Sequence, residues 1–241
     1  MPTAVVTGAS GGVGQSLVAE LLLREFHVVG VDSADAPGPT SRRYKHVRAD
    51  LGELDQITDL AKNLPISTGL LIHSAAVQPL LSAGSGHPQV WSRAFAVNVL
   101  SLEMLTAQLK PALVANEPHA VLAIGSIHDR QTSSSMAPYS VSKAALAAWI
   151  RAAAIDLAPS IQLLNIGLGA TDTPMLKANL EQRGDHATAE ATLRSSLLST
   201  DFIDPNNFAT FCLSLLGPMM PHLTGTTIRV DSGASIRLGG E

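Results

Sequence analysis

The sequence predicts an α/β protein in which a parallel sheet is covered by helices on both faces. Two observations predict this class. Short apolar, β-branched runs alternate with longer helical patterns along the 241 residues, and a Gly-rich turn joins the first run to the first helical pattern. Such alternation is typical of βαβ units with right-handed crossovers, whose ligands bind at the carboxyl edge of the sheet.

The expected elements follow in chain order. The first strand spans residues 3–6 and the first helix residues 14–26, where leucine and valine recur at helical spacing. An Ala- and Leu-rich helical stretch is expected at residues 144–157, and Pro138, which precedes it, occupies a plausible first helical position. Further strands are expected at residues 27–31, 69–73, 120–124, 161–166 and 226–230.

One domain is expected over residues 1–241, because no repeat, low-complexity tract or long linker divides the chain. Residues 175–204 are amphipathic and carry mixed charge, and they lie between two strands that a short connection could join. This insertion is predicted to be a substrate lid at the carboxyl edge.

Composition and charge exclude several classes. Hydrophobic residues make up 46% and charged residues 15% of the chain, which suits a buried core rather than disorder. The net charge of −4 disfavours binding to nucleic acid or an anionic membrane. The single cysteine, Cys212, excludes an internal disulfide, and the histidines show no metal-ligand spacing, so no metal is expected. Without a leader pattern or a membrane-length apolar run, we expect a cytoplasmic protein.

The loop after the first strand has the pattern of a dinucleotide-binding turn. Glycines at positions 8, 12 and 14 permit a tight turn and close approach to a pyrophosphate, and the helix N-terminus supplies N–H donors. The alternative is an ordinary Gly-rich turn, but the strand before it and the helix after it favour a dinucleotide. The expected contacts are Gly8, Ser10, Gly11, Gly12, Val13 and Gly14.

Asp32 ends the second strand, where a carboxylate can bind the adenosine ribose and repel a 2′-phosphate. We therefore expect NAD rather than NADP. The alternatives are a turn aspartate, or Arg42 or Arg43 reaching a 2′-phosphate from beyond a Pro/Gly loop. Asp50 and Leu51 are candidates at the adenine, although Asp50 could simply cap a helix near residue 52.

Tyr139 and Lys143 share one face at the start of the predicted helix. An ammonium four residues from a phenol favours the phenolate, which lowers the pKa of the tyrosine toward an acid–base range. Alone, such a pair is usually solvated surface. Ser126 follows the strand at 120–124 and is expected to converge with the pair at the carboxyl edge.

Together these residues resemble the short-chain dehydrogenase/reductase family in its compact single-domain form, over essentially the whole chain. The resemblance implies a doubly wound Rossmann fold of about seven strands in the order 3-2-1-4-5-6-7. It also implies an NAD-dependent oxidoreductase that interconverts a secondary alcohol and a ketone. The matching segments are Thr7-Gly8-x-x-x-Gly12-x-Gly14, Asp32, Asn98 after Phe95-Ala96-Val97, Ser126, Tyr139-x-x-x-Lys143, Asp172-Thr173-Pro174-Met175, Leu223-Thr224-Gly225 and Val230-Asp231-Ser232-Gly233.

The resemblance also implies roles for individual residues. Tyr139 would be the acid/base, Ser126 would position the substrate oxygen, and Lys143 would lower the tyrosine pKa and hold the nicotinamide ribose. Asn98 would anchor a water of the proton relay, and Thr173 would contact the nicotinamide carboxamide. Further cofactor contacts are expected from Ser74, Ala75, Ala76, Gly169 and Thr171, and pocket residues from His128, Asp129, Arg130, Gln131, Met136 and Met175.

Two positions depart from the family pattern. His73-Ser74-Ala75-Ala76 replaces the common Asn-Asn-Ala-Gly, and His73 is either a satisfied buried histidine or a functional one. The His-x-Ala-Ala pattern is similar to the extended branch of the superfamily, which includes epimerases and dehydratases, although the length argues against it. Leu168-Gly169 replaces the common Pro-Gly, so the turn beside the nicotinamide should be less rigid.

The alanine-rich helix at 144–157 permits close packing of a second helix. The resemblance implies a homodimer or homotetramer built partly on it, with a small alcohol or ketone as the substrate. Two other functions stay open. One is an NAD-dependent epimerase or dehydratase without net NADH formation, and the other is a non-catalytic dinucleotide-sensing protein.

Overall fold

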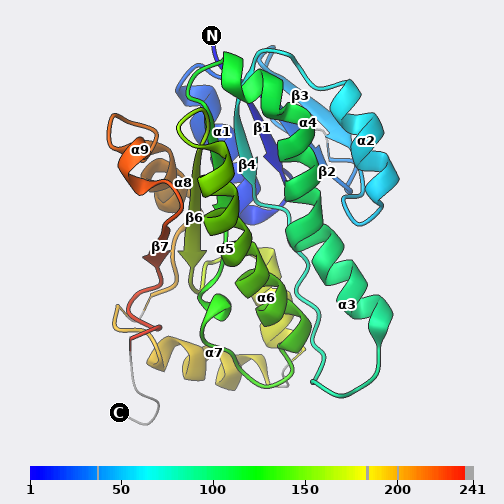
Figure 1. Cartoon of the computed structure of the whole chain (residues 1–241). Coiled ribbons are helices and arrows are strands. Elements are labelled where there is room, and N and C mark those ends of the chain that lie inside the picture. The colour runs from blue at the N-terminus through cyan, green and yellow to red at the C-terminus, as the bar shows by residue number, and fades with distance from the viewer. Residues whose placement is uncertain (37, 183–184, 200, 237–241) are drawn as a thin grey trace.

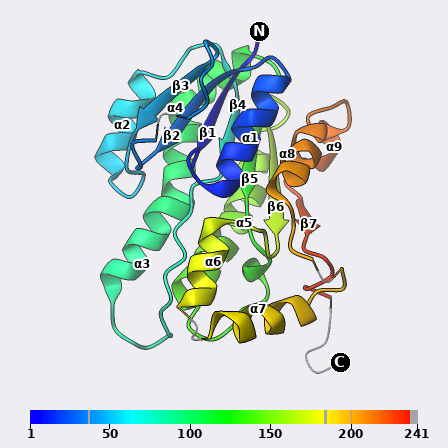
Figure 2. The ribbon, with the colours of Figure 1, turned by 180° about the vertical axis from the view of Figure 1, so that it is seen from behind.

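The computed structural model describes residues 1–36, 38–182, 185–199 and 201–236, and in these residues it has a seven-stranded sheet (Figure 1). Neighbouring strands are parallel, in the order β3-β2-β1-β4-β5-β6-β7. Helices lie on both faces of the sheet (Figures 1 and 2). The predicted fold class and strand order are therefore confirmed.

The strands are β1 (Thr3–Thr7), β2 (His27–Asp32), β3 (Tyr44–Arg48), β4 (Thr68–His73), β5 (Ala120–Ile124), β6 (Gln162–Leu168) and β7 (Thr227–Val230). The α-helices are α1 (Gly12–Leu23), α2 (Leu54–Lys62), α3 (Pro88–Phe95), α4 (Ser101–Ala115), α5 (Ala137–Leu157), α6 (Pro174–Glu181), α7 (His186–Ser195), α8 (Pro205–Ser214) and α9 (Met220–Leu223). A π-helical turn, η1 (Ala96–Leu100), joins α3 to α4, and a 3₁₀ turn, η2 (Ile127–Asp129), follows β5.

Alternate residues of each inner strand contribute to two separate apolar cores. Val5 packs with side chains of α2, α4 and α5. Its neighbours Ala4 and Val6 pack with α1 and α8 on the other face. Because both faces are covered, a side chain or loop reaches a ligand only at an edge of the sheet, and the strand-to-helix loops emerge at the carboxyl edge.

The sequence-based prediction missed one strand, β3. Its side chains are half-buried or exposed, and it forms the end of the sheet, with β2 as its neighbour. An edge strand needs no continuous apolar run, because only part of it is covered. Because polar residues such as Lys45 and His46 interrupt its apolar pattern, the strand was not predicted from the sequence.

The segment at 175–204 contributes most of α6 and the whole of α7. Both helices lie beyond the carboxyl ends of β6 and β7 (Figures 1 and 2). Residues 183, 184 and 200 of this segment lie outside the described residues. The role of the segment as a substrate lid stays a prediction. Over the part of the chain that the structure describes, no helix has the length and apolar character needed to cross a membrane.

Candidate active site

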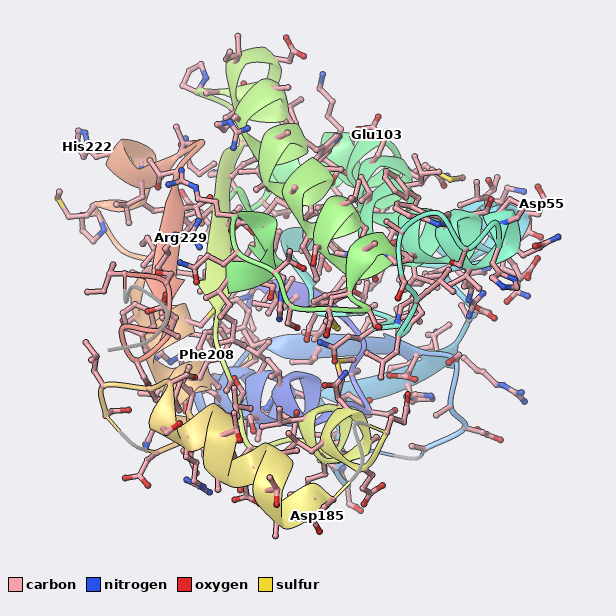
Figure 3. The ribbon with its side chains drawn as sticks, turned by 90° about the horizontal axis from the view of Figure 1, so that it is seen from below. Asp55, Glu103, Asp185, Phe208, His222 and Arg229 are labelled. Atoms are coloured by element: carbon pink, nitrogen blue, oxygen red, sulfur yellow. The ribbon has the colours of Figure 1, made fainter. Side chains whose placement is uncertain are left out.

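The carboxyl edge of the sheet collects residues from distant parts of the chain. β1 leads into the Gly-rich loop, β4 into Ser74, β5 into Ser126 and β6 into Gly169. Figure 3 views the molecule from this side. The predicted site residues therefore share one face because parallel strands end together.

The Gly-rich loop has the close packing that its glycines predict. Gly8 has a φ of +66°, and a Cβ there would lie 2.7 Å from the backbone nitrogen of Ala75. A Cβ on Gly14 would collide with the carbonyl oxygen of Gly8, and one on Gly12 would lie 2.8 Å from the Thr173 methyl group. Gly11, at the N-cap of α1, has no side chain to occupy the first amides of the helix. Those N–H groups can bind a phosphate.

A cavity beside this loop is lined by several of the residues predicted to contact the adenosine half of a dinucleotide. Asp32 is held firmly at its wall, because Oδ2 accepts a hydrogen bond from the Ser10 amide and Oδ1 one from the Ala34 amide, each at 2.9 Å. A carboxylate fixed in this way can accept from a ribose hydroxyl. The cavity is lined by Gly8, Val31, Asp32, Ser33, Ala49, Asp50, Leu51, Ala75, Ala76, Val77, Arg93 and Val97.

Sequence reasoning missed Arg93, which enters this cavity from α3. Its Nη2 lies 2.7 Å from Oδ1 of Asp50. Burial raises the pKa of Asp50, but hydrogen bonds from Arg93 and the Gly52 amide, with the charge of Arg93, lower it overall. The alternative that Asp50 caps a helix is wrong, because α2 begins only at Leu54 and Asp50 accepts from the Gly52 amide at 2.9 Å. Only the tertiary structure places Arg93 here, since α3 is distant in sequence.

Of the two arginines considered for a 2′-phosphate, Arg42 is exposed in the loop before β3 and Arg43 is held at the end of α1. Arg43 donates to the Leu22 carbonyl and lies 3.7 Å from Glu25, at the end of α1. Arg48, in β3, is nearer to the cavity, since its Nε donates to the Ser33 carbonyl at 3.2 Å. Arg48 is thus the exposed cation beside Asp32 that the sequence did not single out.

Ser126, Tyr139 and Lys143 lie together where β5 ends and α5 begins. The Lys143 side chain crosses the buried space below Tyr139, with Nζ 5.8 Å from the centre of the tyrosine ring and 2.8 Å from the Ile124 carbonyl oxygen, to which it donates. Ser126 is close enough to Tyr139 for its side chain to lower the pKa of the tyrosine. The structure brings these three residues together, and their catalytic roles stay a prediction.

Burial dominates the electrostatics of this group. It raises the pKa of Tyr139, and the hydrogen bond with Ser126 offsets the shift only in part. It also lowers the pKa of Lys143 to about 8. The expected lowering of the Tyr139 pKa by Lys143 is not met in this structure, because burial removes the phenolate from water and raises the pKa.

Asn98 is presented by the π-helical turn η1. Its Oδ1 accepts from the Val77 amide at 2.9 Å, and its Nδ2 donates to the Val77 carbonyl at 3.0 Å and to Ser142 Oγ at 2.8 Å. Ser142 directly precedes Lys143, so Asn98 joins the loop after β4 to the N-terminal part of α5. π-Helical turns often occur at functional sites, and no sequence signal predicted this one.

His73 is a buried, neutral residue at the end of β4. Its Nδ1 lies 2.9 Å from Thr7 Oγ1, which also accepts from the Ala75 amide. Burial, followed by the charge of Lys143, lowers the pKa of His73 to about 3. Within the described residues Nε2 makes no hydrogen bond of good geometry, although the backbone of Val97 and Asn98 is close enough to favour the protonated ring. The structure confirms that His73 is buried, but only one ring nitrogen is paired within the described residues, so the ring is not fully satisfied as the first alternative expected.

A chain of hydrogen bonds orders the predicted nicotinamide loop. Thr173 Oγ1 accepts from the Leu176 amide as the N-cap of α6 and donates to the Thr171 carbonyl, while Thr171 Oγ1 donates to the Gly169 carbonyl. Leu168 is paired with Val230 of β7. The loop is therefore held by hydrogen bonds and strand pairing, and its lower rigidity without a proline at position 168 stays a prediction.

The candidate substrate residues separate into two groups. The His128 ring lies edge-on to the Tyr139 ring at 5.7 Å between centres, and Met175 is 43% exposed at the start of α6. Gln131 instead donates to the Ser235 carbonyl at 2.5 Å, and Asp129 accepts from Arg229. Both polar groups are thus engaged by the C-terminal part of the chain, which makes them weaker candidates for direct substrate binding.

Comparison with known proteins agrees with this geometry. The family model of the short chain dehydrogenases matches residues 2–184. The chain belongs to the short-chain dehydrogenase family. As a member of that family, it is an oxidoreductase.

Relatives of this short-chain dehydrogenase are distant in sequence but match nearly its whole length. Dehydrogenase/reductase SDR family member 4 of Sus scrofa is 24% identical, over 98% of this chain and 88% of its own. A solved 4-hydroxyisoleucine dehydrogenase complexed with NADH superimposes with a TM-score of 0.90 at 18% identity, covering 99% of this chain and 100% of that one. A candidate NAD(P)-dependent gluconate 5-dehydrogenase from Beutenbergia cavernae, with NADP bound at low occupancy, has a TM-score of 0.86 at 22% identity, covering 98% and 97%. At these identities, the structural matches establish the fold.

Proposed function

We propose that this short-chain dehydrogenase is an NAD-dependent enzyme that interconverts a secondary alcohol and a ketone. The observation that carries the proposal is the convergence of Ser126, Tyr139 and Lys143 beside the Gly-rich loop. A bound nicotinamide dinucleotide supplies the hydride acceptor or donor, and the protein provides orientation and electrostatics.

The residues of the chain divide the remaining work. Tyr139 Oη accepts the hydroxyl proton of an alcohol in one direction and returns it to a carbonyl oxygen in the other. The Ser126 hydroxyl orients the same substrate oxygen. Lys143, 2% exposed, places a cation in a region of low dielectric, where it stabilises the phenolate more strongly than it would in water. Asn98 hydrogen-bonds the Val77 backbone and Ser142, and so holds the loop after β4 against the start of α5.

A panel of secondary alcohols tests the reaction type. With NAD present, we expect net NADH formation and a product two mass units lighter than the alcohol, because one hydride and one proton leave it. A product of unchanged mass without net NADH would favour an epimerase, and loss of water would favour a dehydratase.

The choice of NAD over NADP rests on Asp32. Its carboxylate lines the cavity and is held there by two backbone amides, so a 2′-phosphate at this place would meet a fixed negative charge. The structural relatives include proteins with NADH and with NADP, which supports a nicotinamide dinucleotide without selecting one.

We expect tight binding of NADH and weak binding of NADPH. The replacement Asp32→Ala should lower the ratio of the NADPH to the NADH dissociation constant by about tenfold, equivalent to about 1.4 kcal/mol. Fluorescence titration of both nucleotides measures this without a substrate. Asp35→Asn is a matched control, because it removes a carboxylate from the exposed loop just after β2. Preference of the unaltered protein for NADPH would contradict the assignment and point to Arg48, beside Ser33, as the phosphate contact.

We also propose a homodimer or homotetramer that uses the outer face of α5. Val141 and Ile155 on this helix are 46% and 84% exposed, and the alanines of α5 permit close approach of a second helix. Light scattering is expected to give two or four times the chain mass of 25.1 kDa. Ile155→Glu should weaken association, whereas Leu23→Glu, on exposed α1 surface, should not. A monomer for the unaltered chain would contradict the proposal.

A further inference from the structure

Asp129 and Arg229 form an ion pair with little exposure to solvent beside the candidate active site. Arg229 Nη2 donates to both carboxylate oxygens, at 2.9 Å and 3.2 Å, and the two side chains are only 4% and 22% exposed. Arg229, on β7, is labelled in Figure 3. Desolvation makes such a pair a weak source of stability, so its fixed geometry is the more informative property.

At one end, the pair restrains the turn that carries Ser126. The Asp129 amide donates to the Ser126 carbonyl at 3.2 Å. The His128 amide donates to Ser126 Oγ, also at 3.2 Å. Because η2 spans only Ile127–Asp129, a shift of the Asp129 backbone is transmitted through these two bonds to Ser126 and to His128, whose ring lies beside Tyr139.

At the other end, the pair is anchored in the strand that supports the predicted nicotinamide loop. Arg229 is opposite Gly167 of β6, where a Cβ would lie 3.3 Å from Arg229 Nη1, so glycine leaves space for the guanidinium. One residue later, the Val230 carbonyl accepts from the Gly169 amide at 2.8 Å. The neighbouring Asp231 packs directly on Gly169.

We propose that Asp129 and Arg229 are a positioning pair, which fixes the position of the turn after Ser126 relative to the loop at Gly169. Neither residue touches substrate or cofactor in this role. The pair determines how the hydroxyl that orients the substrate oxygen lies relative to the nicotinamide side of the site. The inference deepens the proposed function and rests on it for its effect on catalysis. Gln131, which donates to the Ser235 carbonyl, is a second tie between the same loop and the C-terminal segment.

Hydrogen exchange followed by mass spectrometry tests the physical part without a substrate. In Arg229→Gln with NADH present, the amide exchange rates at residues 126–131 and 167–173 should rise at least about tenfold, because local opening of these segments becomes easier. Exchange in β1 and α1 should stay unchanged. Asp129→Asn, which keeps the shape of the side chain, should give the same pattern in a milder form. Asp59→Asn is the control, because it breaks an exposed ion pair with Lys62 on α2.

Kinetics with the best alcohol of the panel test the functional part. Each single variant should lower kcat by about tenfold or more, while its NADH dissociation constant stays within about twofold of that of the unaltered protein. The double variant Asp129→Asn/Arg229→Gln should have a kcat no lower than that of the poorer single variant, because the two residues act as one pair. A purely structural pair would lower Tm without changing kcat of the folded enzyme. Unchanged exchange at 126–131, unchanged kcat, or additive losses would each overturn the inference. If the exchange pattern appears but the unaltered protein oxidises no alcohol, the proposed function fails and the physical coupling stands.

Discussion

Replacement of Tyr139 with phenylalanine is expected to lower kcat by about 10²- to 10⁴-fold, the usual contribution of a positioned acid or base. The substitution removes Oη and keeps the ring that packs edge-on to His128. Steady-state oxidation of an alcohol with NAD, together with a fluorescence titration of NADH, separates the chemical step from cofactor binding. The NADH affinity should change little.

Tyr44→Phe is a matched control, since Tyr44 is the second of the two tyrosines of the chain. Its hydroxyl lies 3.3 Å from His46 Nδ1 in β3. The control loses the same atom in another part of the sheet, so kcat should stay within about twofold. Retained turnover in Tyr139→Phe would reject the acid–base role, and an equal loss in Tyr44→Phe would indicate a general effect on folding.

The second large effect is expected in acid, from His73. The pKa of this ring is about 3 in the folded protein, against 6.5 for an ordinary histidine. As pH falls below 6.5, His73 therefore becomes protonated in the unfolded chain but stays neutral in the folded protein. The contribution of the neutral ring to the free energy of unfolding is fully present above pH 6.5 and is lost progressively toward pH 3. A shift of this size corresponds to about 4 to 5 kcal/mol of unfolding free energy over that range.

His73→Asn should remove this dependence, because an amide does not titrate. Urea unfolding at pH 7, 5.5 and 4.5 measures the free energy of unfolding of both proteins at each pH. The variant can be less stable at pH 7, but its loss between pH 7 and 4.5 should be smaller by about 2 to 3 kcal/mol, the part of the proton linkage that falls in this window. His222→Asn, at an exposed position, is the control and should keep the slope of the unaltered protein. Equal slopes for His73→Asn and the unaltered chain would show that His73 is not held neutral.

The fold was predictable because its signals are local. β1 and β4 are buried over their full length, and such strands appear in the sequence as short continuous apolar runs. The Gly-rich loop and the Tyr139–Lys143 spacing are also local patterns, which place residues on one loop or one helix face whatever surrounds them. Edge strand β3 escaped detection because it is only partly covered.

The sequence by itself thus determined the fold class, the Gly-rich loop and most of the residues that meet at the carboxyl edge, and its resemblance to a known family gave the strand order. Only the tertiary structure decided which ionisable side chains are buried and desolvated. It buries Lys143 and Tyr139, so the tyrosine pKa rises where spacing alone predicted a fall. It also pairs Asp50 with Arg93, and Asp129 with Arg229 from a strand 100 residues further along the chain. The physical reason is that desolvation and long-range pairing depend on residues that are distant in sequence, and a local pattern contains no information about them.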